Sequence, residues 1–247
     1  MLQGTTVVLT RPVDQARAAA NLIEANGGRA ILFPALEISP HTPEPDARAA
    51  LERADVAIFI SANAVEFGLL YVRGKLPDNL QLAAIGHATA QALKYHGYGN
   101  VIVPESGADS EALLATAALQ AVQGKQLVIF RGVGGRETLR TVLCQRGAKL
   151  AYIECYTRRA PAVSASAVAD LVHRDDIAAI HVLSRETLEN FCTMIGPENT
   201  ATLHQKVLFV PHLAVREAAR ILGFGDVTVT GFGDDGLIAA LQQRFGP

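Results

Sequence analysis

Small polar residues and arginines stand where predicted strands turn into predicted helices, and together these side chains could bind an anion. Backbone N–H groups at a helix N-terminus, hydroxyls and guanidinium groups all donate hydrogen bonds to carboxylate or phosphate oxygens. In a parallel sheet such turns lie at the carboxyl ends of the strands, where ligands usually bind. Ser61, Thr89 and Ser184 could also serve as helix N-caps, and a cap can still donate to a ligand. The candidate donors in these turns are Arg11, Ser61, Asn63, Gly86, His87, Thr89, Ser184, His212 and Arg216.

Two further arginines lie in the stretch LVIFRGVGGRETL. Arg131 could pair with a carboxylate or be an ordinary surface arginine, and the N–H groups of GVGG before Arg136 could lie against an anion. GVGG lacks the GxGxxG spacing, and no acidic residue is placed to bind a ribose, so we expect no dinucleotide site. The seven histidines form no HxH or HExxH pattern, so we expect no metal site. We interpret His87 as a helix-start residue in preference to a base.

Strands and helices in alternation are needed to position these residues. TVVLT (6–10), DVAIFIS (55–61) and QLAAIG (81–86) are typical of buried parallel strands, and a segment with helical spacing follows each. AILFPALEISP is expected to form a further strand after a helix that ends at Gly27-Gly28. This alternation continues along the chain and predicts an α/β fold with parallel, doubly wound sheets.

The second half of the chain repeats the first. LVIFRG (127–132) aligns with VVLTRP (7–12), HVLSRETLENF aligns with FISANAVEFGL, and LFVPHLAVREAARILGFGDVTV aligns with AAIGHATAQALKYHGYGNVIV. Ordered matches over nearly the whole chain indicate a duplicated unit, and hence two α/β domains. The alignment pairs Arg131 with Arg11, Ser184 with Ser61, His212 with His87, and Tyr156 with Leu36.

Two corresponding segments, ILFPALEISP and AYIECYTRRAP, are too long for one buried strand, and the second ends in the charged pair Arg158 and Arg159. If each crosses from one domain to the other, the two would pair as a two-stranded linker. The alternative is a long edge strand within one sheet. We predict a discontinuous first domain of residues 1–35 and 162–247, a second domain of residues 41–154, and linker strands at 36–40 and 155–161.

Composition limits the class of protein. The chain has 247 residues, of which 49% are hydrophobic and 19% charged, so a buried core is easily built. A net charge of −2 gives no broad basic face for nucleic acid, so local arginines must bind any anionic ligand. We find no signal-peptide pattern, no apolar run near the roughly 18 residues of a membrane helix, and no CxxC spacing among three cysteines. We expect a cytoplasmic protein that binds neither nucleic acid nor membrane.

The order of these motifs resembles that of the uroporphyrinogen-III synthase family over essentially the full chain. The resemblance depends on LTRP, IFISANAVEF, AAIGHATAQAL, the glycine-arginine turn after VIF, RGAKLAYIECYTR and the segment from TLENF onward. It implies two α/β domains joined by a two-stranded linker, which favours the linker interpretation. It also implies an enzyme without cofactor or metal. Its substrate would be hydroxymethylbilane, a linear tetrapyrrole with carboxylate side chains, closed to uroporphyrinogen III with loss of water and inversion of ring D.

The resemblance further implies roles for single residues. Tyr156 corresponds to the family's tyrosine in ECY, and its phenol would act as a general acid on the leaving hydroxyl. Alternatively, Tyr156 packs between domains with its hydroxyl satisfied. Thr89, in GHAT, resembles the family's threonine and would bind substrate. The turn VPHLAVR departs from the family, because many members carry a hydroxyl near Leu213. A donor there must be backbone, His212 or Arg216.

We expect a monomer whose partner is hydroxymethylbilane, with transient hand-over from the deaminase that precedes it. The alternative is a non-catalytic, two-lobed cytoplasmic binding or sensor protein that closes on an anionic ligand, since internal repeats with a hinge would serve it equally well. A nucleotide-using or phosphate-using enzyme is not favoured, because the sequence has no P-loop or Rossmann fingerprint.

Overall fold

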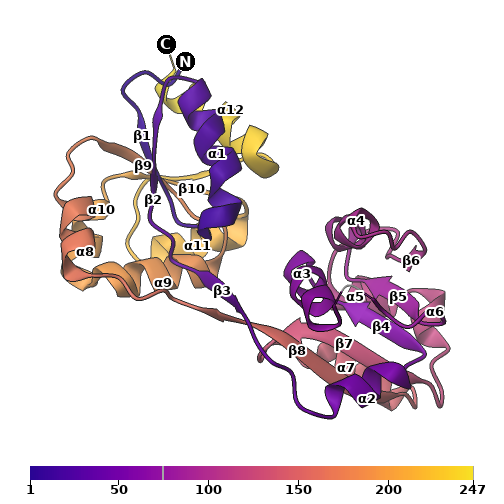
Figure 1. The fold of residues 1–247 in the computed structure, drawn as a ribbon. Coiled ribbons are helices and arrows are strands. Elements are labelled where there is room, and N and C mark those ends of the chain that lie inside the picture. The colour runs from indigo at the N-terminus through magenta and orange to yellow at the C-terminus, as the bar shows by residue number, and fades with distance from the viewer. Residues whose placement is uncertain (74, 247) are drawn as a thin grey trace. The chain divides into compact units, whose positions relative to one another are not determined.

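The computed structural model describes residues 1–73 and 75–246, which form two compact units. The first unit combines Met1–Glu37 with Arg159–Pro247, and the second is Ile38–Arg158. Each unit has a central, mainly parallel sheet with helices on both faces (Figure 1). The predicted fold class, with two doubly wound α/β domains and a discontinuous first one, is confirmed. The predicted domain limits and the linker role of 36–40 and 155–161 stay a prediction.

The first unit contains a five-stranded parallel sheet in the order β11-β10-β9-β1-β2. Val8 of β1 packs on one face with α9 and α11, whereas Val7 and Leu9 pack on the other with α1 and α12. The central strands are therefore buried on both faces, as their continuous apolar runs predict. The strands are β1 (Thr6–Leu9), β2 (Arg29–Leu32), β9 (Ile177–His181), β10 (Val207–Val210) and β11 (Val227–Val229). The helices are α1 (Val13–Ala25), α8 (Ala165–Val172), α9 (Arg185–Ile195), α10 (Pro197–Leu203), α11 (Leu213–Ile221) and α12 (Gly233–Phe245).

The second unit contains a six-stranded sheet in the order β3-β8-β7-β4-β5-β6. Val56 and Ile58 of β4 pack with α5, α6 and α7, whereas Ala57 and Phe59 pack with α2, α3 and α4. Phe59 stacks on Phe130 of the neighbouring strand, with ring centroids 4.4 Å apart. The strands are β3 (Glu37–Pro40), β4 (Val56–Phe59), β5 (Gln81–Ala84), β6 (Val101–Ile102), β7 (Gln126–Gly132) and β8 (Lys149–Arg159). The helices are α2 (Ala47–Glu52), α3 (Ala62–Tyr71), α4 (His87–Tyr95), α5 (Ser110–Leu114), α6 (Ala117–Gln120) and α7 (Thr138–Gln145).

The strand orders of the two sheets match through the sequence repeat. Replacing each strand of β11-β10-β9-β1-β2 by its repeat equivalent gives β6-β5-β4-β7-β8, which is the order in the second unit apart from β3, added beside β8. In both sheets the chain builds outward from a central strand in two directions, which is the doubly wound arrangement. The two halves therefore share a topology as well as a motif order.

The segment AILFPALEISP is not one strand. It forms β2 and β3, with Pro34 in the break between them. Proline lacks the N–H that a ladder needs, so the strand ends before it. The equivalent segment has no proline before residue 161 and forms the single strand β8 of 11 residues.

β3 runs opposite to β8. The His41 N–H donates to the Cys155 carbonyl at 2.9 Å, while Glu37 forms an ion pair with Arg159 at 3.2 Å. Later residues of β3 therefore lie beside earlier residues of β8, as in an antiparallel pair.

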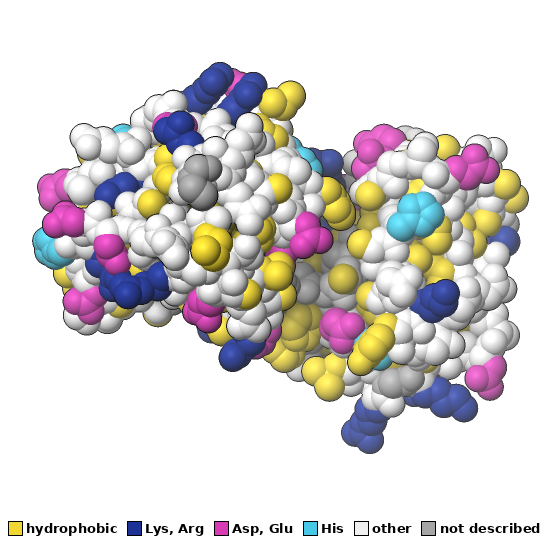
Figure 2. Space-filling view, turned by 90° about the horizontal axis from the view of Figure 1, so that it is seen from above, with side chains coloured by type: hydrophobic (Ala, Val, Ile, Leu, Met, Phe, Trp, Pro, Cys, Tyr) yellow, Lys and Arg dark blue, Asp and Glu magenta, His cyan; other side chains and the backbone are white. Residues whose placement is uncertain are grey.

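Within the described residues no helix is both long and apolar enough to cross a membrane. On the face drawn in Figure 2, basic and acidic side chains are mixed over each unit.

Candidate active site

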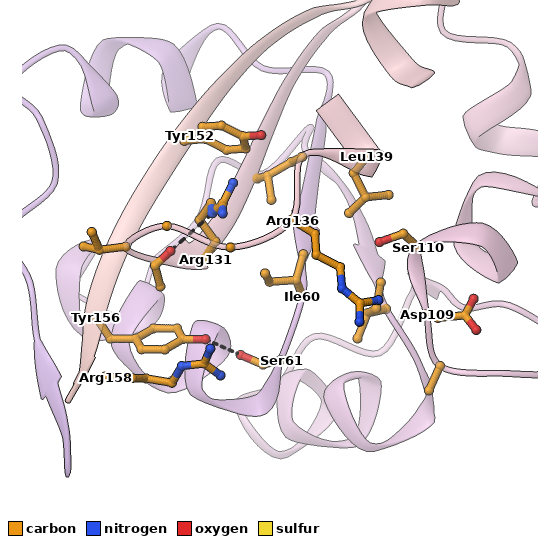
Figure 3. A pocket seen from close by; sticks show the side chains of 17 residues that line it. Ile60, Ser61, Asp109, Ser110, Arg131, Arg136, Leu139, Tyr152, Tyr156 and Arg158 are labelled. Atoms are coloured by element: carbon orange, nitrogen blue, oxygen red, sulfur yellow. Dashed lines mark hydrogen bonds between the residues drawn. The ribbon is translucent and has the colours of Figure 1, made fainter. Parts of the chain in front are cut away.

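A cavity of about 330 Å³ opens at the carboxyl edge of the sheet in the second unit. It lies where β4, β5 and β7 end, beside β8, which is where an α/β sheet usually binds ligands. Apolar residues form part of its wall, and hydroxyl and guanidinium groups form the rest (Figure 3). The apolar residues are Ile60, Ile85, Ala108, Ile129, Val133 and Leu139, and the polar ones are Ser61, Asp109, Ser110, Arg131, Arg136, Tyr152, Tyr156 and Arg158.

Tyr156 reaches this cavity because β8 contains a β-bulge. Arg131 pairs with Glu154 and Gly132 with Tyr156, so Cys155 is an extra residue on β8. In a regular strand neighbouring side chains face opposite ways, but Cys155 and Tyr156 pack in the same apolar cluster. A bulge re-aims side chains in this way and is common beside active sites.

The Tyr156 side chain is held on three sides. Its ring lies 5.7 Å from the Phe67 ring, centroid to centroid, and the residue is 4% exposed. An ideal Cβ on Gly132 would lie 2.6 Å from the ring, so only glycine leaves room for it. The phenol oxygen lies 3.1 Å from Ser61 Oγ, the contact dashed in Figure 3. Ser61 is also the N-cap of α3 and accepts the Ala64 N–H at 3.0 Å.

Arg131 is buried, with 2% of its surface exposed, so the surface-arginine interpretation is wrong. Its guanidinium donates to Glu137 at 3.0 Å, lies 3.8 Å from Glu154, and stacks 4.4 Å above the Tyr152 ring. Its Nη2 is buried and has no hydrogen-bond partner in the described part of the chain. Glu154 also accepts the Gly134 N–H at 3.1 Å. The two carboxylates therefore fix both Arg131 and the glycine turn.

Tyr152 donates to Glu137 at 2.6 Å, and this bond perturbs both groups. It is the first cause of a lowered pKa at Glu137, to which Arg131 also contributes. The pKa of Tyr152 is raised to about 12, first by burial and then by the same bond. Tyr152 is thus a fixed hydrogen-bond donor at neutral pH.

Arg136 and Arg158 line the cavity with exposed side chains. Arg136 follows Gly134 and Gly135, which adopt φ values of +75° and +105° that favour glycine. Figure 3 shows the Arg136 side chain extended toward Ser110 and Asp109. These two arginines add positive charge to the open part of the cavity, where an anionic ligand could reach it.

The other predicted residues of the second unit lie around α3 and α4 and are not among those that line the cavity. Gly86 is the N-cap of α4, and a Cβ there would lie 2.7 Å from the Ala108 Cβ. His87 is the first residue of α4 and is exposed, so it is a helix-start residue. Thr89 lies inside α4 and is 4% exposed, so its interpretation as an N-cap is wrong. Asn63 is half-buried in the first turn of α3.

In the first unit, Arg11 is buried within a polar cluster at the end of β1. It donates to Asp234 at 2.7 Å and contacts His181 Nδ1 at 3.3 Å. Burial and, second, the positive charge of Arg11 lower the pKa of His181 to about 3. His181 is therefore neutral at ordinary pH. Neither Arg11 nor Arg131 is a surface arginine, and both bind acidic side chains.

Three further predicted residues stand at helix starts of the first unit. Ser184 is the N-cap of α9 and accepts the Thr187 N–H at 3.1 Å. His212 is the exposed N-cap position of α11, and its side chain makes no cap hydrogen bond. Arg216 Nε is buried and has no hydrogen-bond partner in the described residues, although it lies 3.5 Å from Glu217.

The polar residues that sequence reasoning missed are Glu137, Tyr152, Glu154, Asp109 and Ser110. Tyr152 and Glu154 follow the alternation of β8 before the bulge, so their spacing to Tyr156 in the sequence did not show which face they share. Asp109 caps α5 by accepting the Ala112 N–H at 2.8 Å. Across residues 1–73 and 75–246, no three His, Cys, Asp or Glu side chains are grouped so as to hold a metal ion.

Comparisons with known proteins agree on one family. Residues 17–239 match the family model of uroporphyrinogen-III synthase HemD. The chain is 31% identical to the uroporphyrinogen-III synthase of Escherichia coli (strain K12) over 249 residues, covering 96% of this chain and 100% of that protein. It is 28% identical to the enzyme of the same name from Synechococcus elongatus over 256 residues, covering 98% and 96%.

Solved structures share the fold. The chain matches uroporphyrinogen-III synthetase from Helicobacter pylori 26695 with a TM-score of 0.65 at 15% identity, over 97% of this chain and 100% of that one. It matches a mutant uroporphyrinogen III synthase from Thermus thermophilus with a TM-score of 0.63 at 14% identity, over 97% and 98%. At such identities the likeness concerns the fold alone, and the sequence matches carry the assignment. The chain belongs to the uroporphyrinogen-III synthase family, as the order of its motifs predicts.

Proposed function

We propose that this protein catalyses the reaction of uroporphyrinogen-III synthases. It closes linear hydroxymethylbilane to uroporphyrinogen III with loss of water and inversion of ring D, a step of tetrapyrrole biosynthesis. Family membership supports the reaction. The observation that carries the chemistry is the cavity of the second unit, where one buried phenol meets apolar walls and exposed arginines.

Tyr156 is the proposed catalytic residue. Its hydroxyl lines the cavity, and its ring is fixed by Phe67, by Gly132 and by the bond to Ser61. A proton donated from the phenol to the substrate hydroxyl would let the C–O bond break, with the electron pair leaving in water. The resulting azafulvene is then attacked by the far pyrrole.

Arginines and backbone donors are proposed to bind the carboxylates of the substrate. Arg136 is the leading candidate, because it is exposed at the cavity and follows a glycine turn. Arg131 would act through Nη2, its one buried and unpartnered nitrogen among the described contacts. Ser61 lies beside Tyr156 at the same edge. The remaining proposed substrate-binding residues are Asn63, Gly86, His87 and Thr89 in the second unit and Arg11, Ser184, His212 and Arg216 in the first.

The cavity also limits how substrate is held. A volume of about 330 Å³ is at the lower end for ligand pockets, so it fits part of a tetrapyrrole and not all four rings. Holding one end of a flexible bilane against Tyr156 restricts the geometries of ring closure, which is how positioning contributes to catalysis. The bilane also closes spontaneously without inversion, so the enzyme must favour one attack geometry.

We further propose that the protein acts in the cytoplasm as a monomer and receives hydroxymethylbilane by transient hand-over from the preceding deaminase. Three free cysteines fit a reducing compartment. Light scattering of the purified protein, alone and mixed with the deaminase, tests both the monomer and the hand-over. A stable dimer would refute the first.

The isomer ratio of the product tests the proposed function. Purified protein is given freshly generated hydroxymethylbilane, the products are oxidised, and type I and type III porphyrins are separated. A product dominated by type III supports the reaction. Type I alone, as in a protein-free control, would favour a non-catalytic binding or sensor protein for an anionic ligand.

A further inference from the structure

We propose that Ser61 is a positioning residue that directs the Tyr156 proton toward the substrate and stabilises the phenol oxygen as that proton leaves. The inference rests on the proposed function of Tyr156 and assigns Ser61 a role that acts through the phenol. It follows from how the hydrogen bonds around Ser61 Oγ must be arranged.

Ser61 Oγ has two neighbours at hydrogen-bond distance. The Ala64 N–H donates to it at 3.0 Å, and the Tyr156 hydroxyl lies 3.1 Å away. A serine hydroxyl has one hydrogen and two lone pairs. The N–H occupies one lone pair, so the contact with Tyr156 uses either the serine hydrogen or the second lone pair.

The two arrangements differ in what they leave for the substrate. If Ser61 donates, the hydrogen of Tyr156 is free to point into the cavity. If Tyr156 donates, its hydrogen is committed to Ser61. Accepting a bond from the Ala64 N–H polarises the Ser61 hydroxyl and makes it a better donor. The structure therefore favours a chain of donors from Ala64 N–H through Ser61 to Tyr156.

The same chain suits the charge that develops during the reaction. When Tyr156 gives its proton to the leaving hydroxyl, the C–O bond breaks, water departs with the electron pair, and a phenolate remains. The Ser61 hydrogen then faces the phenolate oxygen, and the N-terminus of α3 adds positive partial charge behind it. After ring closure the attacking pyrrole loses a ring proton as it regains its aromaticity, and this proton restores the phenol.

The other neighbours of the Tyr156 phenol differ from Ser61 in what their loss should change. The Phe67 ring and Gly132 pack on the Tyr156 ring and have no side-chain donor. Arg158 lines the same cavity with an exposed cation, which would attract substrate carboxylates as well as the phenolate, so its loss should raise KM. Removing the Ser61 hydroxyl should instead impair proton transfer while leaving substrate binding largely intact.

The test is a double-mutant cycle measured as kcat and KM for type III product. Ser61→Ala should lower kcat about 10- to 100-fold, as expected for a lost hydrogen bond to a charged oxygen, with little change in KM. Ser61→Thr, which keeps a hydroxyl, should restore most of the rate. In a Tyr156→Phe background, Ser61→Ala should change kcat by less than about twofold, because its partner is already gone.

Capping must be separated from positioning. Ser164 is a matched control, because it caps α8 by accepting the Ala167 N–H at 3.2 Å and lies in the first unit. Ser164→Ala should lose comparable stability and keep wild-type kcat. If Ser61→Ala folds poorly, Ser61→Gly removes the same hydroxyl and glycine is better tolerated than alanine at an N-cap.

The outcomes are distinguishable. Wild-type protein that yields only type I product refutes the proposed function itself. Wild-type protein that yields type III product while Ser61→Ala or Ser61→Gly retains wild-type kcat refutes the positioning role. An equal loss of kcat in the native and Tyr156→Phe backgrounds shows that Ser61 acts independently of the phenol, which also refutes it.

Discussion

Gly132→Ala tests whether the position of the Tyr156 ring limits the reaction. The φ of Gly132 is not positive, so alanine is compatible with the backbone and any effect comes from the new methyl group. That methyl would lie 2.6 Å from Cε2 and 2.9 Å from Cζ of Tyr156. Ordinary contacts begin at 3.4 Å, so the ring must retreat by about 0.8 Å.

A retreat of this size is enough to disable the site. The phenol oxygen lies 3.1 Å from Ser61 Oγ, and a further shift of about 0.8 Å in the wrong direction exceeds hydrogen-bond range. Misplacing a reacting group by about 1 Å can cost about 10²-fold in rate. We therefore expect kcat to fall by about two orders of magnitude, with about 1–3 kcal/mol of stability lost to overpacking.

The assay is single-turnover formation of type III product, with urea unfolding of the same samples. Gly68→Ala is the matched control, because its Cβ would meet Phe130 Cδ1 at the same 2.6 Å, and its three nearest atoms all belong to Phe130. It should lose similar stability and keep its rate. The reasoning is refuted if Gly132→Ala retains wild-type kcat, or if both variants lose rate equally.

Three other predictions concern single side chains. Tyr156→Phe should lower kcat about 10²- to 10⁴-fold as a lost general acid, while the free energy of unfolding changes by about 1 kcal/mol, since one hydrogen bond is lost; a wild-type rate would remove the acid role. His181 has its pKa lowered from 6.5 to about 3, so the unfolded state binds the proton first and stability falls as pH drops below 6.5. At pH values well below 6.5 but above the lowered pKa, the free energy of unfolding should fall by about 1.4 kcal/mol per pH unit. His181→Gln should flatten this slope in urea titrations, and an unchanged slope would contradict the prediction. Tyr152→Phe removes the first cause of the lowered pKa of Glu137, a contribution that is present above pH 4.5 and lost as pH falls through the lowered value. The wild-type advantage over this variant should therefore shrink below pH 4.5, and a difference that stays constant with pH would count against the assignment.

The fold could be predicted largely from sequence, because the alternation of buried strands and helices is a local pattern and the repeat appears when the two halves of the chain are aligned. The repeat predicts two similar units, and the strand orders of the two sheets match through it, although the order itself was not predicted. What local patterns did not reveal was where a strand breaks, as Pro34 shows, since an apolar run on both sides of a proline still reads as one strand. Thr89 was considered as an N-cap because the sequence alone does not show at which residue α4 begins. The N-cap is Gly86, so Thr89 lies inside the helix.

The candidate site was predicted only in part, for a physical reason. Ser61 and Arg136 follow strand ends, Arg131 and Tyr156 lie within β7 and β8, and the structure brings all four to one cavity. The partners of Arg131 come from register between strands. Glu154 stands opposite Arg131 only because of how β7 and β8 align, and no spacing along one chain contains that information.

The bulge at Cys155 shifts by one residue the alternation of the side chains that follow it on β8. Upstream residues follow one alternation and Tyr156 follows the opposite one, so the strand has two halves that are out of step by one residue. Deleting Cys155 would restore a regular strand in which the tyrosine takes the position of Cys155, on the Ile153 side of the sheet, so the phenol would keep its present face. Regular pairing of the unchanged sequence would instead place Cys155 opposite Gly132 and turn the phenol to the Tyr152 side. The bulge therefore decides which face of the sheet carries the phenol, although no residue type near it changes.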